Sequence, residues 1–268
     1  MKHLFYLVAF LFIFNISFSQ TQDKGPEMVL VEGGEFYMGN DYSANSDERP
    51  EHKVTLNTFF MSKYEVTIED YAKFCRVTGH KLPEGEARTP INNLTWKDAV
   101  MYCNWLSRAS RLEKCYDIKR DSNRFTATFI PEANGYRLPT EAEWEFAARG
   151  GLKSRAYAFS GSHDLDEVAW SINNSGNSAH EIGQKKPNEL GIYDMTGNAM
   201  EWCYDWYETT YYEVSPESNP IGPATGVSKV CRGGNFMCRS DVLRNSRRFN
   251  LDPGQTEGLA GIRLVKNQ

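Results

Sequence analysis

Residues 135–145 read Gly-Tyr-Arg-Leu-Pro-Thr-Glu-Ala-Glu-Trp-Glu, and this stretch decides more about the fold than any other in the chain. Thr140 and Glu143 form a capping box, in which each side chain accepts a hydrogen bond from the other residue's backbone N–H. The predicted helix continues through the apolar residues Trp144, Phe146 and Ala147. Glycines at positions 150 and 151 predict its end, because glycine tolerates the left-handed backbone that closes a helix.

Two further helices are predicted upstream by similar start signals. Thr67 precedes an acidic first turn, and the run that it opens ends near Gly79. Thr95 opens a second run, whose apolar residues recur at helical spacing. These residues are Trp96, Ala99, Val100, Cys103 and Leu106.

Strand-like segments are short and scattered, at residues 28–32, 34–38, 53–60, 200–206, 229–233 and 261–265. Between them lie long stretches rich in glycine, asparagine, serine and proline, notably residues 153–187 and 213–228. Loops of that length are uncommon in a compact domain unless they bind something or are clamped. Since no repeat or low-complexity linker divides the chain, the pattern predicts one α+β domain.

The N-terminus predicts export. Lys2 and His3 precede an apolar run at residues 4–16, and small residues stand at positions 17 and 19. These are the three parts of a secretory signal peptide, so we expect a signal peptide at 1–19, a polar leader at 20–26 and one domain at 27–268. A membrane anchor is the alternative, although the run is shorter than the ~20 residues that a span needs. Periplasm, cell surface and secretion all stay open.

The net charge argues against a nucleic-acid-binding protein, and the cysteine content favours a protein with disulfides. The formal net charge of −5 offers no basic field for a phosphate backbone, so we expect no nucleic-acid partner. Six cysteines in an exported chain favour disulfides, without fixing which of ~15 pairings forms. They are Cys75, Cys103, Cys115, Cys203, Cys231 and Cys238, and none lies at zinc-type spacing.

Six blocks of sequence, taken in order, resemble the formylglycine-generating enzyme (sulfatase-modifying factor) family. They are residues 33–39, 63–67, 135–145, 188–202, 232–236 and 261–265. The resemblance covers residues 27–265, essentially the whole expected domain. It implies a C-type-lectin-like α+β fold with little regular secondary structure, which agrees with the loop-rich pattern above.

The resemblance implies a structural calcium ion. Its ligands fall here on Asp194, Gly197, Ala199 and Glu201, the middle two through backbone oxygen. Calcium takes six to eight oxygen ligands, so a mixture of carboxylates and carbonyls suits it. The alternative is a turn with two solvated carboxylates. A second family calcium site would fall within residues 168–178, where Trp170 replaces an expected asparagine.

The resemblance also implies copper-dependent oxidation of a sulfatase cysteine to formylglycine by dioxygen, with two thiolates holding Cu(I). Cys238 occupies the first thiolate position and Leu243, which has no ligand atom, the second. Asn235 further replaces an expected serine, and Met200 an expected tryptophan. Other sulfur atoms stay open as a second ligand, on Cys231, Met200 and Met237.

These departures favour a non-catalytic member that binds an exported protein or ligand, with a sulfatase among the candidates. The alternative is a copper-dependent oxidase with an altered ligand set, in which Cys238 is catalytic. The arginines at 239, 244, 247 and 248 are expected to form mostly surface ion pairs, whereas Arg263 is expected to pair inside the core. Glu141, Glu143 and Glu145 are not expected to carry acid–base chemistry.

Overall fold

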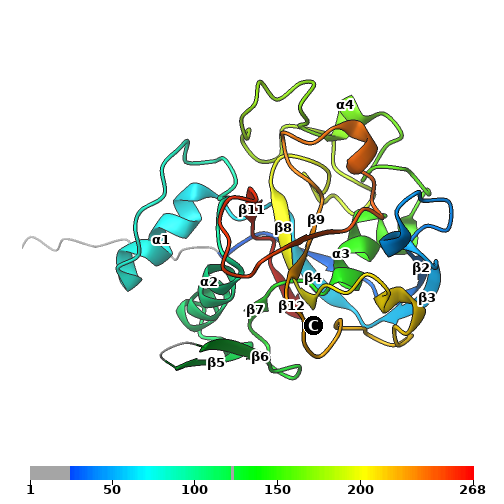
Figure 1. Cartoon of the computed structure of the whole chain (residues 1–268). Coiled ribbons are helices and arrows are strands. Elements are labelled where there is room, and N and C mark those ends of the chain that lie inside the picture. Colours follow the sequence, from blue (N-terminus) through cyan, green and yellow to red (C-terminus); the bar gives the residue numbers. More distant parts are fainter. Residues whose placement is uncertain (1–24, 122–123) are drawn as a thin grey trace, which may run out of the picture.

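The β8–β9 ladder separates two groups of elements in this computed structural model, which describes residues 25–121 and 124–268 (Figure 1). Helices α1 and α2 lie on one side of the ladder, and α3 with β2 and β3 lies on the other. The expected signal peptide at 1–19 and most of the leader at 20–26 fall outside the described residues. No helix in the described part of the chain is long and apolar enough to cross a membrane.

Two four-stranded sheets and two hairpins account for the strands of the described residues. The first sheet has the order β1 (Met28–Val31), β4 (Phe59–Ser62), β12 (Val265–Asn267), β7 (Tyr136–Arg137). The second has the order β10 (Phe249–Leu251), β9 (Lys229–Arg232), β8 (Met200–Trp206), β11 (Ala260–Gly261). The hairpins are β2 (Gly34–Met38) with β3 (His52–Leu56), and β5 (Tyr116–Asp121) with β6 (Arg124–Phe129).

The three long helices start where the sequence places them. They are α1 (Ile68–Thr78), α2 (Trp96–Ala109) and α3 (Glu141–Ala148). Thr67 caps α1 by accepting a hydrogen bond from the backbone of Asp70, and Gly79 closes it in the left-handed region at φ 77°. Both α2 and α3 begin with complete capping boxes. A short fourth helix, α4 (Leu165–Val168), lies in the stretch predicted to be a loop.

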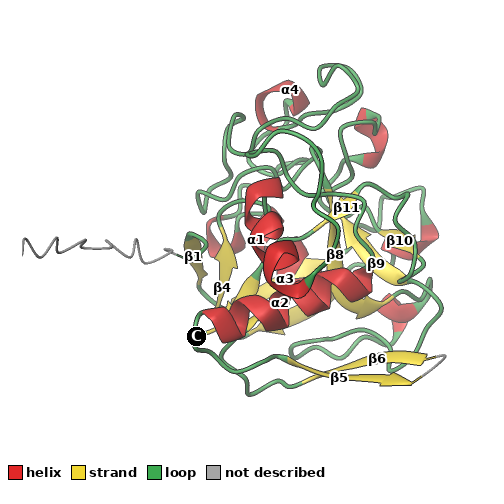
Figure 2. Cartoon of the chain, turned by 90° about the vertical axis from the view of Figure 1, so that its left-hand side faces the viewer, coloured by secondary structure: helices red, strands yellow, loops and turns green. Residues whose placement is uncertain are grey.

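Two features of the sheets differ from the sequence expectation. The segment predicted as one strand at 53–60 is two strands, because the chain turns at Asn57 and Thr58 between β3 and β4. The β5–β6 hairpin was not predicted, since charged residues dominate β5 and conceal any apolar alternation. Figure 2 shows this hairpin below α2, while loops fill the region above the helices.

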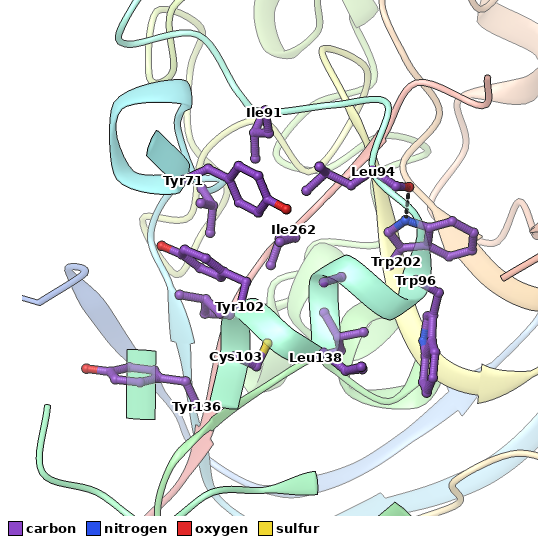
Figure 3. Close-up of a cluster of buried hydrophobic side chains, with 14 of the residues drawn as sticks. Tyr71, Ile91, Leu94, Trp96, Tyr102, Cys103, Tyr136, Leu138, Trp202 and Ile262 are labelled. Carbon is purple, nitrogen blue, oxygen red and sulfur yellow. Dashed lines mark hydrogen bonds between the residues drawn. The ribbon is translucent and has the colours of Figure 1, made fainter. Parts of the chain in front are cut away.

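Two hydrophobic clusters form most of the core. The larger one lies between α1, α2 and the second sheet, and Figure 3 shows its aromatic and aliphatic side chains. Within it, the Trp202 indole N–H donates to the backbone oxygen of Leu94 over 2.9 Å, which fastens β8 to the loop before α2. The second cluster packs α3 against strands β1 to β4. Together the two clusters form the packed core to which the loop-rich part of the chain is attached.

Helix α3 is buried along its whole length, including three glutamates. Arg137 pairs with Glu143 at 2.6 Å, and Arg232 contacts both Glu141 and Glu145. Buried carboxylates need such partners, because an unpaired charge in the core is costly. The glutamates of the opening sequence stretch therefore pair with buried arginines and support the packing of α3.

Candidate functional site

Cys238 and Leu243 come together against Gly234, although a short 3-10 turn separates them in sequence. A Cβ atom on Gly234 would lie 2.5 Å from Leu243 Cδ2 and 3.5 Å from Cys238 Sγ. Gly234 also has φ 68°, in the left-handed region. Only glycine therefore fits between the two side chains, and the structure places Cys238 beside the position that the resemblance gives to its missing partner.

Leu243 fills its position as a core residue. It is 1% exposed and packs in a small cluster with Leu165, Val168 and Ala169, against which Cys238 also lies. An aliphatic side chain packed in this way offers no lone pair to a metal ion. Cys238 is therefore the only thiol at this position among the described residues.

The Cys238 thiol is half-buried and held by Asn235. The Asn235 backbone N–H donates to Sγ over 3.4 Å, and its Oδ1 lies 3.5 Å from Sγ as acceptor for the thiol. Burial raises the pKa of Cys238, an effect opposed by the Asn235 N–H and by Arg247. The group is thus a thiol at neutral pH, whereas the thiolate is the nucleophile and the metal ligand.

The other candidate sulfur atoms lie elsewhere. Cys231 and Met200 belong to the larger core cluster, which is separate from the one that contacts Cys238. Met237 follows Asn235 closely but is 51% exposed. The expected disulfides are absent: all six cysteines are free, and five of them are buried.

The calcium prediction falls on a buried group of carboxylates around Arg263. The guanidinium contacts both oxygens of Glu201, with Nε 2.9 Å from each, and the Trp144 indole N–H donates to Oε2 over 2.6 Å. Arg263 is fully buried, so the expected structural role of this arginine is confirmed. Glu201 already has donors on both oxygens, which counts against it as a calcium ligand.

Asp194 and Glu65 complete this carboxylate group. Asp194, at φ 58°, accepts a hydrogen bond from Gly183 on Oδ2 over 2.7 Å. Glu65 accepts from the backbone of Ala199 over 3.0 Å and from the Asn198 amide over 2.9 Å. Sequence reasoning missed Glu65, although it lies within the block 63–67, because its partners are 133 and 134 residues away.

The group carries more negative than positive charge. Burial raises the pKa of Asp194 to about 6, and burial together with Asp194 and Glu201 raises that of Glu65 well above its usual value. A divalent cation would relieve this repulsion, and Asp194 has an oxygen to offer. However, no group of three or more His, Cys, Asp or Glu side chains in residues 25–121 and 124–268 is arranged to hold a metal. Calcium at this place stays a prediction.

The arginine tract runs from an exposed residue to a fully buried one. Arg239 is largely exposed, whereas Arg244 and Arg247 are partly buried and pair with the buried Glu48 at 2.6 and 3.8 Å. Arg248, by contrast, is 1% exposed and its guanidinium holds Glu141. The expectation of a surface role is therefore wrong for Arg248, because a buried glutamate of α3 requires this cation.

The family model for the "Sulfatase-modifying factor enzyme 1-like domain" matches residues 14–268. The chain belongs to this family. The α+β, C-type-lectin-like formylglycine-generating-enzyme fold with little regular secondary structure is thereby confirmed, as solved sulfatase-modifying-factor-like folds superpose over nine-tenths of the chain.

Three similar proteins illustrate the range of the sulfatase-modifying factor family. Chaperone protein LppX of Paenibacillus barcinonensis is 35% identical and covers 90% of each chain. The formylglycine-generating enzyme of Streptomyces coelicolor is 28% identical, covering 89% of this chain and 88% of its own. The solved structure of Treponema denticola variable protein 1 matches with a TM-score of 0.79 and 29% identity, covering 90% of this chain and 95% of its own. The family thus includes proteins named as enzymes and proteins named otherwise.

Proposed function

We propose that this sulfatase-modifying-factor-like chain is an exported, non-catalytic member that acts by binding a protein or ligand. The observation that carries the proposal is the replacement of the second thiolate by Leu243, which is packed at 1% exposure beside Cys238. Cu(I) is held by soft sulfur ligands, and one protonated thiol is a poor site for it. Loss of the copper site removes the family's oxidation chemistry while leaving the scaffold.

Two further observations support a binding role. The buried ion pairs of α3 and the ion pair between Glu201 and Arg263 preserve the fold even though the cysteine pair is incomplete. A relative that covers nine-tenths of this chain is named a chaperone protein, a name that describes protein binding rather than oxidation. Because the sequence predicts a signal peptide at 1–19, we expect the partner to be exported as well, with a sulfatase among the candidates.

Copper binding provides the first test. Purified protein is titrated with Cu(I) against a colorimetric chelator under reducing conditions, together with the variants Cys238→Ser and Leu243→Cys. We expect the wild type and Cys238→Ser to compete equally poorly, and Leu243→Cys to compete more strongly because it restores two thiols. Copper binding by the wild type that Cys238→Ser abolishes would overturn the proposal.

Activity and binding are then measured on the same preparation. Copper-loaded protein is incubated in air with a cysteine-containing sulfatase peptide, and mass spectrometry follows the cysteine. We expect no aldehyde, and its appearance would establish the alternative, a copper-dependent oxidase with an altered ligand set. In parallel, light scattering of a sulfatase diluted from denaturant tests binding. We expect the protein to suppress aggregation and albumin at equal concentration not to, and equal scattering in both would count against a role on this client.

A further inference from the structure

A pocket of about 610 Å³ opens between α1, α2 and the chain at Ser62–Val66. Figure 1 shows the two helices on the left of the molecule. None of its lining residues belongs to the Cys238–Leu243 cluster or to the arginine tract. Its size is within the range of ordinary ligand pockets. The sulfatase-modifying factor resemblance assigns nothing to it.

Aromatic rings form one side of this pocket. Trp105 is half-buried, and its ring lies 5.6 Å from that of Tyr102 and 5.7 Å from that of Phe74, which fix the indole in place. Tyr102 itself lies deep in the core, facing Tyr71 (Figure 3). Tyr64 lines the pocket from a second segment of the chain. Aromatic rings thus line the pocket, and such rings attract cations through their quadrupoles. The Tyr64 ring already has the Lys63 ammonium 5.3 Å from its centroid, which leaves Trp105 as the ring for a further cation.

The charges around the pocket leave an acidic surplus. Lys73 pairs with Asp70 at 3.2 Å, and Lys63 nearby pairs with Glu27 at 3.3 Å. Glu69, which also lines the pocket, is exposed and makes no ion pair with any described residue. A ligand would therefore meet a carboxylate that has no cation of its own.

Arg88, the remaining cation of the lining, lies 3.9 Å from Glu181 and is mostly exposed. Each basic side chain of the pocket is thus matched by a carboxylate, which leaves nothing to attract an anion. Apolar groups are also present, since Leu106 and Val77 line the pocket and Val77 is 73% exposed. They suit the methylene stem of a long basic side chain.

We propose that this pocket binds a lysine or arginine side chain of an extended peptide segment. The cationic head would lie between Glu69 and the face of Trp105, and the stem and a neighbouring apolar residue would pack on Leu106 and Val77. The inference concerns a surface away from Cys238, so it stands or falls independently of copper chemistry.

Isothermal titration calorimetry tests this with defined peptides. The probe is acetyl-Lys-Leu-Lys-Leu-amide, and the comparison is acetyl-Glu-Leu-Glu-Leu-amide. We expect the basic peptide to bind more tightly, with an affinity that falls as salt is added, because exposed charges are screened. Equal binding of the two peptides, or no binding of either, would overturn the proposal.

Two variants locate the site. Glu69→Gln is expected to weaken the basic peptide about 2–5-fold, the effect of one exposed ion pair. Trp105→Leu is expected to weaken it by a similar factor, through loss of the aromatic face. Glu257→Gln removes the same charge from an exposed position outside the pocket and is expected to change nothing. A loss as large in Glu257→Gln as in Glu69→Gln would place binding elsewhere.

Charge reversal gives a readout that a merely structural role for Glu69 would not move. In Glu69→Lys, we expect the preference between the two peptides to invert, while circular dichroism and the unfolding curve stay close to wild type. Retention of the basic preference in this folded variant would contradict the assignment of Glu69.

Discussion

Glu141 and Arg248 form a bidentate ion pair inside the protein, with Arg248 Nε 2.7 Å from Oε1 and Nη2 2.9 Å from Oε2. Arg232 donates to the same Oε1 over 3.0 Å. Burial alone would raise the pKa of Glu141, but the two guanidinium groups hold it below its usual value. The carboxylate is therefore ionised in the core, and its two cations come from 107 and 91 residues further along the chain.

Arg248→Met is expected to destabilise the protein by about 3–5 kcal/mol, because it removes one partner of a buried pair and leaves excess negative charge. Urea unfolding followed by tryptophan fluorescence measures the change. Arg239→Met serves as control, since Arg239 is 82% exposed in its side chain and should shift stability by less than about 0.5 kcal/mol. Similar losses in the two variants would mean that Arg248 has no special role.

Leu243→Ala is expected to cost about 2–5 kcal/mol, the range for a leucine removed from a packed core. The reason is its 1% exposure within the cluster at Leu165, Val168 and Ala169. Thermal and urea unfolding measure the loss. Val227→Ala, at a position 86% exposed, is the control and should be nearly neutral. A neutral Leu243→Ala would show that this residue does not support the fold.

The helices were the part of the fold most open to prediction, since their signals are local. Thr67, Thr95 and Thr140 cap α1, α2 and α3 through bonds to residues only three positions on. Ion-pair partners such as Arg248 could not be found in the same way, because nothing near position 248 indicates a glutamate 107 residues earlier. The expected surface role of that arginine was wrong for this reason.

The candidate site was predictable in part, for a related reason. The motif positions bring Cys238 and Leu243 together as the resemblance implies. The resemblance does not reveal that both oxygens of Glu201 already accept hydrogen bonds from Arg263 and Trp144, because these donors come from segments 62 and 57 residues away in the sequence. Disulfides were expected from the number of cysteines and the predicted export, and neither carries information on the distance between two cysteines.

Added calcium is expected to raise the melting temperature, because a divalent cation would neutralise the carboxylate excess at Asp194 and Glu65. An ion at ~100 times its dissociation constant would contribute ~2.7 kcal/mol. Asp194→Asn should abolish the shift, and magnesium serves as the control ion. Differential scanning calorimetry with calcium and with chelator makes the comparison, and identical melting curves would contradict the calcium prediction. Glu201→Ala is the less useful variant, since it also leaves the buried Arg263 without this ion-pair partner.

The buried carboxyl of Asp205 should make stability depend on pH. Burial and the neighbouring Glu141 raise its pKa to about 8, so the folded protein holds a proton that the unfolded chain releases near pH 4. Stability from this group is therefore present at low pH and is lost as pH rises. Burial lowers the pKa of the nearby Lys229 to about 7, so its opposite contribution begins only above that pH.

Asp205→Asn is expected to remove this dependence between about pH 4 and 7. Over that interval the wild type should lose more than about 1 kcal/mol relative to the variant, since one pKa unit corresponds to ~1.4 kcal/mol. Urea unfolding at several pH values measures both proteins. Parallel stability curves would mean that Asp205 is ionised throughout.

The ion pairs of α3 join residues that are far apart in the sequence, and this separation affects when the helix can reach its native contacts during synthesis. Glu141 cannot be neutralised until Arg232 and Arg248 have been synthesised, and Arg137 bonds Asn267, which is 130 residues further on. Contacts of such separation slow folding, because the loop must close before they form. A nascent chain that ends soon after α3 contains Arg137 for Glu143 and Arg149 for Glu145, but it lacks both cations of Glu141. The native surroundings of Glu141 can therefore be completed only once the chain extends to Arg248.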